Sequence, residues 1–378
     1  MKKQKKNKGK KILYKYAELF CGPGGLGLGA SMAEAEKDGS LYSIKHEWVS
    51  DYHSDSCNTY RLNIMKDNPE NVIYGDVRKL NIKQLSPIDI FAYGFPCNDF
   101  SIVGKQKGFQ GDFGPLYTYG VKVINYFKPA AFIAENVGGI KSANDGKAFR
   151  KILHDLETAG RGYNITVNYY KFEEYGIPQT RHRVIIAGVA KDIGRYFAVP
   201  APTHKNKPVT VREVLENKPI GPDIKNNELK NQSEAVVERL KYIKPGENSW
   251  TAEIPKRLQL DVKSAKLSQI YKRLHPDKPS YTLTGSGGGG THGYHWKYNR
   301  GLTNRERARI QTFPDDFVFC GSSESVRKQI GMAVSPLMSK IVFEALLKTL
   351  AGVSYKSVEP NIVYEQRLFE EELELISA

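Results

Sequence analysis

Apolar and polar positions alternate in a characteristic way along the first half of the chain. Short runs rich in β-branched and aromatic residues are separated by stretches of helical length. Strand–helix alternation of this kind predicts an α/β fold, with a doubly wound, mostly parallel sheet covered by helices on both faces. The predicted strands are 14–20, 42–49, 72–74, 88–93, 130–134, 164–172 and 183–189, and the predicted helices are 116–127 and 147–159.

The pattern changes near residue 190. From there to about 300 the chain is rich in Pro, Lys and Asn, contains the run Gly285–Gly290 (interrupted by Ser286), and shows no clear alternation. This block predicts a separate, loop-rich domain at 189–300. Helical periodicity then returns. Its predicted helices are 303–311, 336–350 and an acidic terminal stretch at 364–374.

Charge is concentrated in two places along the 378 residues. The whole chain carries 56 Lys and Arg against 41 Asp and Glu, a formal charge of +15. Residues 1–11 hold seven Lys and no acid, and residues 189–300 hold 20 basic and 11 acidic residues. Such a distribution indicates a polyanion partner such as nucleic acid, or else a role in solubility. We expect the tail at 1–11 to be a disordered, non-specific tether.

Composition excludes several classes of protein. Hydrophobic residues make up 40% and charged residues 26%, which argues against a wholly disordered, collagen-like or coiled-coil chain. No run of about 18 apolar residues predicts a membrane span, and no apolar stretch follows the basic start as a secretory signal would. The four Cys form no C-x-x-C pair and no zinc pattern, so we expect a reducing, cytoplasmic setting with free thiols.

A glycine-rich turn follows the first predicted strand. Phe20, Gly22, Gly24 and Gly25 stand where backbone N–H groups can approach a ligand closely. The spacing matches neither the dinucleotide fingerprint G-x-G-x-x-G nor a phosphate-binding loop. A plain strand–helix turn is the alternative interpretation.

Two aspartates end the next strands. Asp51 follows the second predicted strand and Asp76 the third, and Tyr52 lies beside the first of them. Ligands of open α/β sheets bind at the carboxyl ends of the strands, where a carboxylate can accept ribose hydroxyls and a tyrosine can stack on a base. Together they favour an adenosine-containing cofactor. Singly, each Asp is more often a helix cap or turn residue.

Candidate catalytic residues follow later strands. Cys97 ends the fourth strand beside a Gly-rich segment and could be a nucleophile, although a lone Cys is more often a small buried hydrophobe. Glu135 follows an apolar run that could raise its pKa. Gln179, Arg181 and Arg183 alternate along an extended segment, so they share a face that suits a phosphate or a base carbonyl, unless it is an exposed edge strand.

In this order, the motifs resemble those of the DNA (cytosine-5)-methyltransferase family, of the prokaryotic or viral restriction-modification type. The resemblance covers nearly the whole chain. It is carried by Phe20-x-Gly22-x-Gly24-Gly25, Gly94-Phe95-Pro96-Cys97, Glu135-Asn136-Val137, Gln179-x-Arg181-x-Arg183, the segment Arg300 to Asp315, and Gln329-Ile330-Gly331-x-Ala333-Val334.

The resemblance implies a role for each motif. S-adenosyl-L-methionine would bind at the glycine turn and be released as S-adenosyl-L-homocysteine. Cys97 would be the nucleophile, Glu135 would contact N3 of cytosine, Arg183 its O2, and Arg181 would support the site or the DNA backbone. The implied cofactor residues are Phe20, Gly22, Gly24, Gly25, Asp51 (ribose), Tyr52 (adenine face), Asp76 (adenine amino group), Val77, Pro96, Leu116 and Ala333. The implied DNA-binding residues are Ser101, Gln179, Arg181, Thr282, Thr284, Gly287, Gly288, His292 and Arg300.

The same resemblance implies the domains and partners. Residues 12–188 and 301–378 would form one discontinuous catalytic domain, and 189–300 would be the target recognition domain. The substrate would be double-stranded DNA. We also expect a monomer without membrane attachment, and a cognate restriction endonuclease acting on the same sequence without forming a complex.

The implied reaction explains why these residue types are needed. Carbon 5 of cytosine becomes nucleophilic only after a thiolate adds to C6, and a donor at N3 and a cation at O2 disperse the charge that develops. The proton on C5 is then lost, and elimination frees Cys97. Because a stacked base is inaccessible, the cytosine must be flipped out, and we expect the segment 98–114 to close over it.

Three positions depart from the family pattern: Glu18, Asn98 and Met332 stand where Asp, Gln and Asn are common. We expect Met332 to pack near the cofactor. The alternatives to a DNA methyltransferase are an RNA (tRNA) cytosine-5 methyltransferase, a catalytically silent DNA-binding relative, and a nicotinamide-dependent oxidoreductase. Retention of Cys97, Glu135 and Arg183 disfavours the second, and the missing fingerprint disfavours the third.

Overall fold

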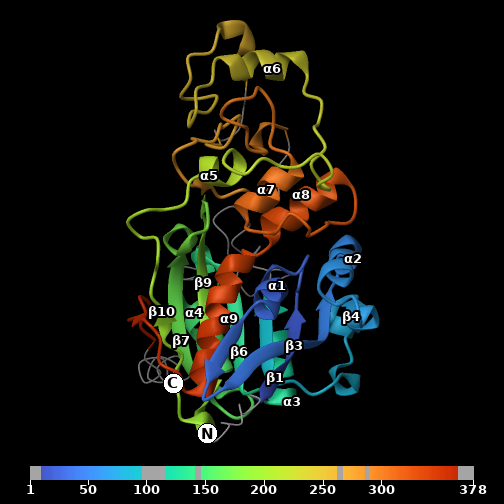
Figure 1. Cartoon of the computed structure of the whole chain (residues 1–378), viewed down its shortest axis with the longest axis vertical. Helices are drawn as coiled ribbons and strands as arrows, with labels where there is room; N and C mark the ends of the chain where they lie inside the picture. The colour runs from blue at the N-terminus through green and yellow to red at the C-terminus, as the bar shows by residue number, and fades with distance from the viewer. Residues whose placement is uncertain (1–9, 96–115, 141–145, 262–266, 286–288, 365–378) are drawn as a thin grey trace, which may run out of the picture.

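The computed structural model describes residues 10–95, 116–140, 146–261, 267–285 and 289–364. Within these ranges the chain forms a large sheet unit and a smaller loop-rich unit beyond one end of the sheet (Figure 1). Pro96, Cys97, Asn98, Ser101, Gly287, Gly288 and the predicted helix at 364–374, apart from its first residue, lie outside the described residues.

The central sheet confirms the predicted α/β class. Its strand order is β2-β3-β1-β5-β6-β9-β7, with β4 also paired to β3. β1, β3, β4, β5 and β6 run parallel to one another, whereas β2 is antiparallel to β3, and β9 is antiparallel to both β6 and β7. The strands are β1 (Lys11–Leu19), β2 (Glu34–Lys37), β3 (Ser40–Asp51), β4 (Val72–Tyr74), β5 (Ile90–Gly94), β6 (Ala131–Val137), β7 (Tyr163–Lys171) and β9 (His182–Ala190).

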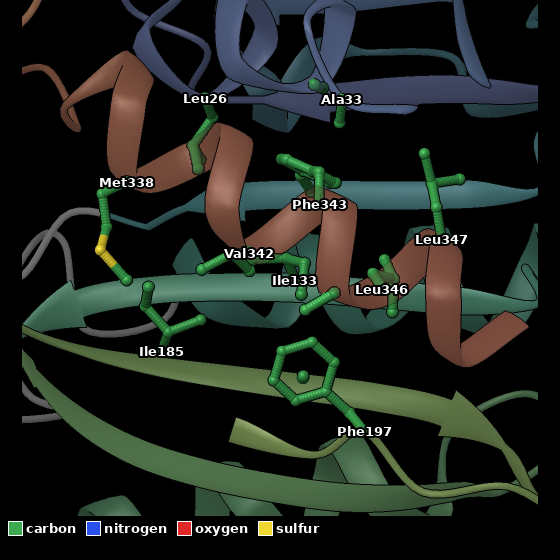
Figure 2. Close-up of a cluster of buried hydrophobic side chains, with 14 of the residues drawn as sticks. Leu26, Ala33, Ile133, Ile185, Phe197, Met338, Val342, Phe343, Leu346 and Leu347 are labelled. Atoms are coloured by element: carbon green, nitrogen blue, oxygen red, sulfur yellow. The ribbon is translucent and has the colours of Figure 1, made fainter. Parts of the chain in front are cut away.

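Helices cover both faces of this sheet, as the alternation predicts. α1 (Gly25–Ser31) and α9 (Pro336–Ala351) pack on one face. α3 (Tyr117–Phe127) and α4 (Lys147–Thr158) pack on the other. Figure 2 shows the first interface, where Val342 and Leu346 of α9 lie beside Ile133 of the sheet; Phe343 packs edge-on against Tyr16 of β1. Burial of such side chains, at about 2 kcal/mol each, is what fixes α9 to the sheet.

α9 also belongs to a helical stretch with the length and composition of a membrane-spanning helix. Together with the preceding α8 (Ser323–Met332), it forms an apolar stretch long enough to cross a membrane. However, 67% of the most apolar window of this stretch is buried inside the fold. A core helix accounts for the signal.

The smaller unit has little regular structure, as its composition predicts. It contains α5 (Val211–Leu215), α6 (Glu234–Lys241) and two small hydrophobic cores, one of which includes Trp296 and the other Tyr294. The pairing of β11 (Ser280–Tyr281) with β8 (Gln179–Thr180) joins this unit to the sheet unit.

The boundaries between the units differ from the predicted 189 and 300. Phe197 and Val199 are buried in the sheet unit, and β10 (Val199–Pro200) pairs with β12 (Ser357–Val358). The chain therefore leaves the sheet unit after residue 200. At the other end, α7 (Asn304–Ile310) shares a core with the loop-rich unit through Ile310, so the chain returns fully only at α9.

Candidate active site

The glycine turn lies between β1 and α1 at the carboxyl edge of the sheet. Phe20, Gly22 and Gly24 all have positive φ values, of 56°, 52° and 99°. Gly25 has no space for a side chain, because an added Cβ would lie 2.1 Å from the carbonyl oxygen of Val334. The turn thus needs glycine for backbone conformation at 22 and 24 and for close packing at 25.

A buried hydrogen-bond network supports this turn from below. Tyr16 Oη lies 2.9 Å from Glu18 Oε2, and Tyr60 Oη lies 3.3 Å from the same oxygen. Tyr60 Oη is also 3.0 Å from His46 Nδ1, and His46 Nε2 is 2.8 Å from Ser31 Oγ. From the sequence, Glu18 is only a departure from the family motif. Strand alternation, which places Glu18 on the same face as Tyr16, is the sequence signal for their contact.

Asp51 closes the turn from the neighbouring strand. Its Oδ2 accepts from the backbone N–H of Gly22 and its Oδ1 from that of His53, each at 2.8 Å. Burial raises the pKa of Asp51, although these two hydrogen bonds oppose the shift. The carboxylate therefore holds the turn in place, and each oxygen keeps a lone pair with which it could accept a ribose hydroxyl.

The other predicted cofactor residues line the same edge. Tyr52 is 69% exposed, and Asp76 caps a short helix while accepting hydrogen bonds from Arg78, which lowers the pKa of Asp76. Phe20, Val77 and Leu116 belong to the same hydrophobic cluster as Phe95. The structure thus brings these residues, from four separate segments, around one region beside the glycine turn.

Glu135 and Arg183 form an ion pair between β6 and β9. Val137 pairs with Arg183 and Glu135 with Ile185, so Glu135 and Arg183 are diagonal neighbours on one face of the sheet. Arg183 Nε lies 2.9 Å from Glu135 Oε1, and both side chains are about seven-eighths buried. Burial raises the pKa of Glu135, and Arg183 and Arg181 partly oppose it. The predicted edge strand is wrong as an alternative, because β9 lies between two strands.

Arg181 supports this pair rather than facing solvent. Its side chain is 2% exposed, its Nε has no hydrogen-bond partner among the described residues, and burial, together with Arg183, lowers its pKa. Contact between Arg181 and a DNA backbone stays a prediction. The alternative role, support of the site, agrees with its position beside Glu135 and Arg183.

Gln179 lies in the interior of the fold. It is fully buried, and its Nε2 donates to Oε1 of Gln311 at 2.9 Å, while its contact with DNA stays a prediction. The amide of Gln311 in turn donates to the carbonyl of Ala333. Sequence alternation could not reveal that a residue 132 positions away occupies the same face. Gln179 connects the β8 segment to the region of α7 and α8.

Asn136 is a site residue to which sequence analysis gave no role. Its Nδ2 donates to the carbonyl of Phe95 at 3.3 Å, and its Oδ1 accepts from the N–H of Val137. Asn136 thus fixes the chain two residues before Cys97. The Glu135-Asn136 motif therefore orders both the ion pair with Arg183 and the chain that leads to the predicted nucleophile.

The predicted DNA-binding residues of the smaller unit have different environments. Thr282 donates from Oγ1 to the carbonyl of Thr180 at 2.6 Å, and Thr284 is exposed. His292 is half-buried. Arg300 forms a two-pronged ion pair with Glu306, at 2.7 and 2.8 Å, which strengthens the capping box at the start of α7. Their contact with DNA remains a prediction.

The end of α8 lies against the glycine turn. Ala333 is buried, and Val334 meets Gly25. Met332 is 58% exposed, and its packing near the cofactor stays a prediction. Its side chain leaves the helix on the solvent side.

Comparison with known proteins places these features in context. The sequence model of the family described as C-5 cytosine-specific DNA methylase matches residues 14–348. The chain is 53% identical to the Type II methyltransferase M.BbvI of Brevibacillus brevis over 368 residues. This aligned region covers 96% of this chain and 98% of that protein. It is 41% identical over 331 residues to M.NgoFVII of Neisseria gonorrhoeae, covering 85% of this chain and 83% of the relative.

Solved structures with the same fold include a DNA modification methyltransferase encoded within an E. coli prophage and the S. pombe Dnmt2 methyltransferase. The first aligns over 89% of this chain and 99% of its own with a TM-score of 0.69 at 24% identity. The second aligns over 90% and 99% with a TM-score of 0.57 at 17% identity. At these identities the likeness concerns the fold alone.

Proposed function

The chain belongs to the C-5 cytosine-specific DNA methylase family and is a DNA cytosine-C5 methyltransferase of the restriction-modification type; from this premise we propose that S-adenosyl-L-methionine is its methyl donor and Cys97 its nucleophile. DNA is the substrate. The buried pair Glu135–Arg183, 2.9 Å apart at the carboxyl end of β6, is the observation that carries the assignment of the base site.

The residues beside the glycine turn fit this donor. Backbone amides at a turn with three positive-φ residues can approach a ligand closely, and the apolar cluster that contains Phe20, Val77 and Leu116 offers a surface for an adenine ring. Tyr52 is exposed at the same edge, and Asp51 keeps free lone pairs. When bound, the donor supplies an electrophilic methyl group on a sulfonium centre. S-adenosyl-L-homocysteine is the corresponding product.

The pair Glu135–Arg183 suits the polar edge of cytosine. A carboxyl group with a raised pKa keeps its proton to higher pH, so Glu135 can donate to N3, while Arg183 presents N–H groups to O2. Both act on the charge that develops when the Cys97 thiolate adds to C6. Elimination of the thiolate, after C5 has lost its proton, restores the aromatic ring. Arg181 positions the pair, and its buried positive charge holds Glu135 in place.

We assign DNA reading to the smaller unit, residues 201–335, and catalysis to the sheet unit. The net positive charge of 189–300 supports this division, because phosphate contacts provide most of the affinity for duplex DNA. Thr282, Thr284, His292 and Arg300 remain its proposed DNA contacts, together with Gly287 and Gly288 outside the described residues. We further propose that the protein acts as a cytoplasmic monomer and that a cognate endonuclease cuts the same sequence when it is unmethylated.

Two experiments test this proposal. The protein is incubated with labelled S-adenosyl-L-methionine and either unmodified duplex DNA or tRNA; label must enter DNA, and label in tRNA alone contradicts the assignment. Duplexes with 5-fluorocytosine, which cannot lose the group at C5, then trap the enzyme. A covalent adduct is expected with the wild type and not with Cys97→Ser. An adduct that survives this substitution excludes Cys97 as nucleophile.

A further inference from the structure

A basic pocket lies where the two units join. It has a volume of about 280 Å³ and is lined by residues of both, Thr180 of β8 and the segments around Gly246 and Lys272–Tyr281. Four of its lining residues are basic (Lys272, Arg273, His275 and Lys278), and none is acidic. The acid nearest in sequence, Asp277, is engaged by Arg212 at 2.9 Å.

The charge of this pocket is not neutralised by the protein. Among the described residues, neither Lys272 nor Lys278 forms an ion pair. Arg273 is buried, and its guanidinium donates to the carbonyl oxygens of Leu240, His295 and Trp296 and to Asn299, none of which carries a charge. A concave site with unbalanced positive charge attracts a compact anion.

The position of the pocket identifies the source of that anion. Thr180 precedes Arg181 and lies three residues before Arg183. The pocket therefore lies beside the chain segment that carries Arg183, so a DNA strand whose cytosine reaches this residue passes close to the pocket. We propose that this pocket binds one backbone phosphate of the DNA strand that carries the target cytosine, with Lys272 and Lys278 as its charged contacts. This rests on the proposed assignment of DNA reading to the smaller unit.

The salt dependence of DNA binding tests this site. Loss of one phosphate contact reduces the slope of log K against log salt by about 0.9, so Lys278→Gln should flatten the slope by that amount and weaken binding about equally for specific and non-specific duplexes. Lys278 is exposed, so this variant should fold normally. Lys272→Arg should retain the wild-type slope, because it keeps the charge. Lys272→Gln should flatten the slope by about 0.9, as Lys278→Gln does. Lys83→Gln, an exposed lysine on the chain entering β5, is the matched control and should change nothing.

Each outcome has a definite meaning. An unchanged slope for both Gln variants, in an enzyme that methylates DNA, overturns the phosphate site and leaves the proposed function intact. Inorganic phosphate, compared with chloride at equal ionic strength, distinguishes the source of the anion. Thermal stabilisation by phosphate that Lys278→Gln abolishes, without any change in the DNA slope, would show a site for free phosphate and contradict the DNA assignment.

A second, independent inference comes from the protons of the network below the glycine turn. Ser31 Oγ lies 3.1 Å from the carbonyl of Gly27, which can only accept, so the hydroxyl proton of Ser31 is used there. Ser31 must then accept from His46 Nε2, which leaves Nδ1 of a neutral imidazole to accept the proton of Tyr60. The contact between Tyr60 Oη and Glu18 Oε2 therefore requires a proton on Glu18.

The environment supports both protonation states. Burial lowers the pKa of His46 to about 4 and raises the pKa of Glu18 to about 8. The other titratable groups that face Glu18 are Tyr16, Tyr60 and Cys21, whose pKa values burial raises, and Asp51, whose charge further raises that of Glu18. Packing against Tyr60 leaves no space for a side chain at position 27, because a Cβ added to Gly27 would lie 2.0 Å from Tyr60 Oη.

We infer that Glu18 acts as a neutral positioning residue, whose donated proton connects β1, α2 (Ser54–Asn63), β3 and α1 and so holds the cofactor turn in its binding geometry. Ionisation of Glu18 would break the contact with Tyr60 and loosen the start of α1. Ionisation of Glu18 would therefore weaken binding of the methyl donor and leave the rate of the chemical step unchanged. This inference uses the proposed identity of the donor.

The pH dependence of KM for S-adenosyl-L-methionine tests this role. In the wild type, KM should rise by up to tenfold per pH unit above about pH 8, with kcat little changed, whereas Glu18→Gln keeps a donor that cannot ionise and should give a flat profile. The unfolding equilibrium gives a second readout. Because the folded pKa of Glu18 is raised, its stabilising effect is lost as pH rises towards 8. Between pH 7.5 and 8, where His46 is largely neutral in both the folded and the unfolded state, the ratio of folded to unfolded wild type should fall at a rate of up to tenfold per pH unit relative to that of Glu18→Gln.

The result that overturns this inference is equally clear. Identical pH profiles of KM in the wild type and Glu18→Gln would show that Glu18 is not the group concerned. Loss of cofactor binding by Glu18→Gln at pH 7, with normal folding, would show that a carboxylate charge is needed there. If neither enzyme uses this donor at any pH, the proposed function fails instead.

Discussion

At the scale of single residues, the base site depends on a carboxyl group whose environment opposes ionisation. Glu135 lies on a fully packed strand, where burial raises its pKa, and Arg183 and Arg181 limit that rise. Two cations beside one carboxyl also have a cost in stability. Burial removes the hydration of Arg181, and no hydrogen bond among the described residues replaces it at Nε. The presence of a buried arginine that lowers stability agrees with a role in catalysis.

Glu135→Gln should lower kcat by about 100-fold or more, since an amide cannot transfer a proton to N3. KM for the methyl donor should change by less than about threefold. In the wild type, activity that needs protonated Glu135 should fall as pH rises, and this limb should be absent in the variant. Steady-state kinetics across pH measure all three quantities. Glu34→Gln, on the exposed edge strand β2, is the control, and equal kcat values for Glu135→Gln and the wild type would contradict the assignment.

At the scale of secondary-structure elements, segments about 300 residues apart in the sequence meet at the glycine turn. Val334, which follows α8, leaves no room beside Gly25 at the start of α1. Gly25→Ala should therefore displace the turn or the α8–α9 connection, because the clash is with a backbone atom. We expect KM for the donor to rise at least tenfold, or about 1.4 kcal/mol.

Isothermal titration with the donor checks this prediction. Gly221→Ala is the matched control, since its nearest neighbour, at 3.7 Å from the added Cβ, is a side chain in ordinary contact. Unaltered affinity in Gly25→Ala would show that the two elements are not held together at this point.

α7 is a second structural centre, formed by buried arginines. Arg305 is fully buried, and its guanidinium donates to the carbonyl oxygens of Lys225, Pro314 and Phe317. Arg305→Met should lower the free energy of unfolding by about 3 kcal/mol or more, because three carbonyl groups lose their partners. Arg257→Met, which removes an exposed pair with Glu238, should cost less than about 1 kcal/mol. Chemical denaturation measures both, and a cost for Arg305→Met as small as that for Arg257→Met would refute this role.

Sequence patterns predicted the elements with strong periodicity and missed those without it. The helices at 117–127, 147–158, 304–310 and 336–351 were found almost at their limits. α1 was missed because Gly25, Gly27 and Gly29 make its sequence look like a loop, although tight packing requires all three. α8 was missed because its polar face conceals buried Ser325, Arg327 and Gln329. Long-range contacts override local propensity at these positions.

At the scale of the whole molecule, charge and architecture both support the proposed location of DNA binding. The +15 of the chain comes mainly from the tail and from 189–300. The resemblance to the family implied the proposed roles of Glu135 and Arg183, and strand alternation showed only that Gln179, Arg181 and Arg183 could share a face. It could not show that Gln179 and Arg181 are buried, because the covering residues include Gln311 from a distant segment. Sequence also placed the unit boundaries too early, since burial of Phe197 depends on α9.

Deletion of residues 2–9 should weaken DNA binding most at low salt, since it removes five lysines and their counterion release. The deletion stops before Lys10, whose carbonyl accepts from Leu41 at the edge of the sheet. The methylated sequence should not change. Binding titrations at several salt concentrations measure the effect, and a changed target sequence would show that the tail takes part in recognition.

The central claim is that this chain transfers a methyl group to carbon 5 of cytosine in DNA through Cys97. Base-resolution mapping of 5-methylcytosine, on unmethylated DNA exposed to the purified protein and S-adenosyl-L-methionine, tests it most directly. We predict 5-methylcytosine at one position of one short sequence, and none after treatment with Cys97→Ser. Methylation at another atom or base, or unchanged 5-methylcytosine with Cys97→Ser, would contradict the account.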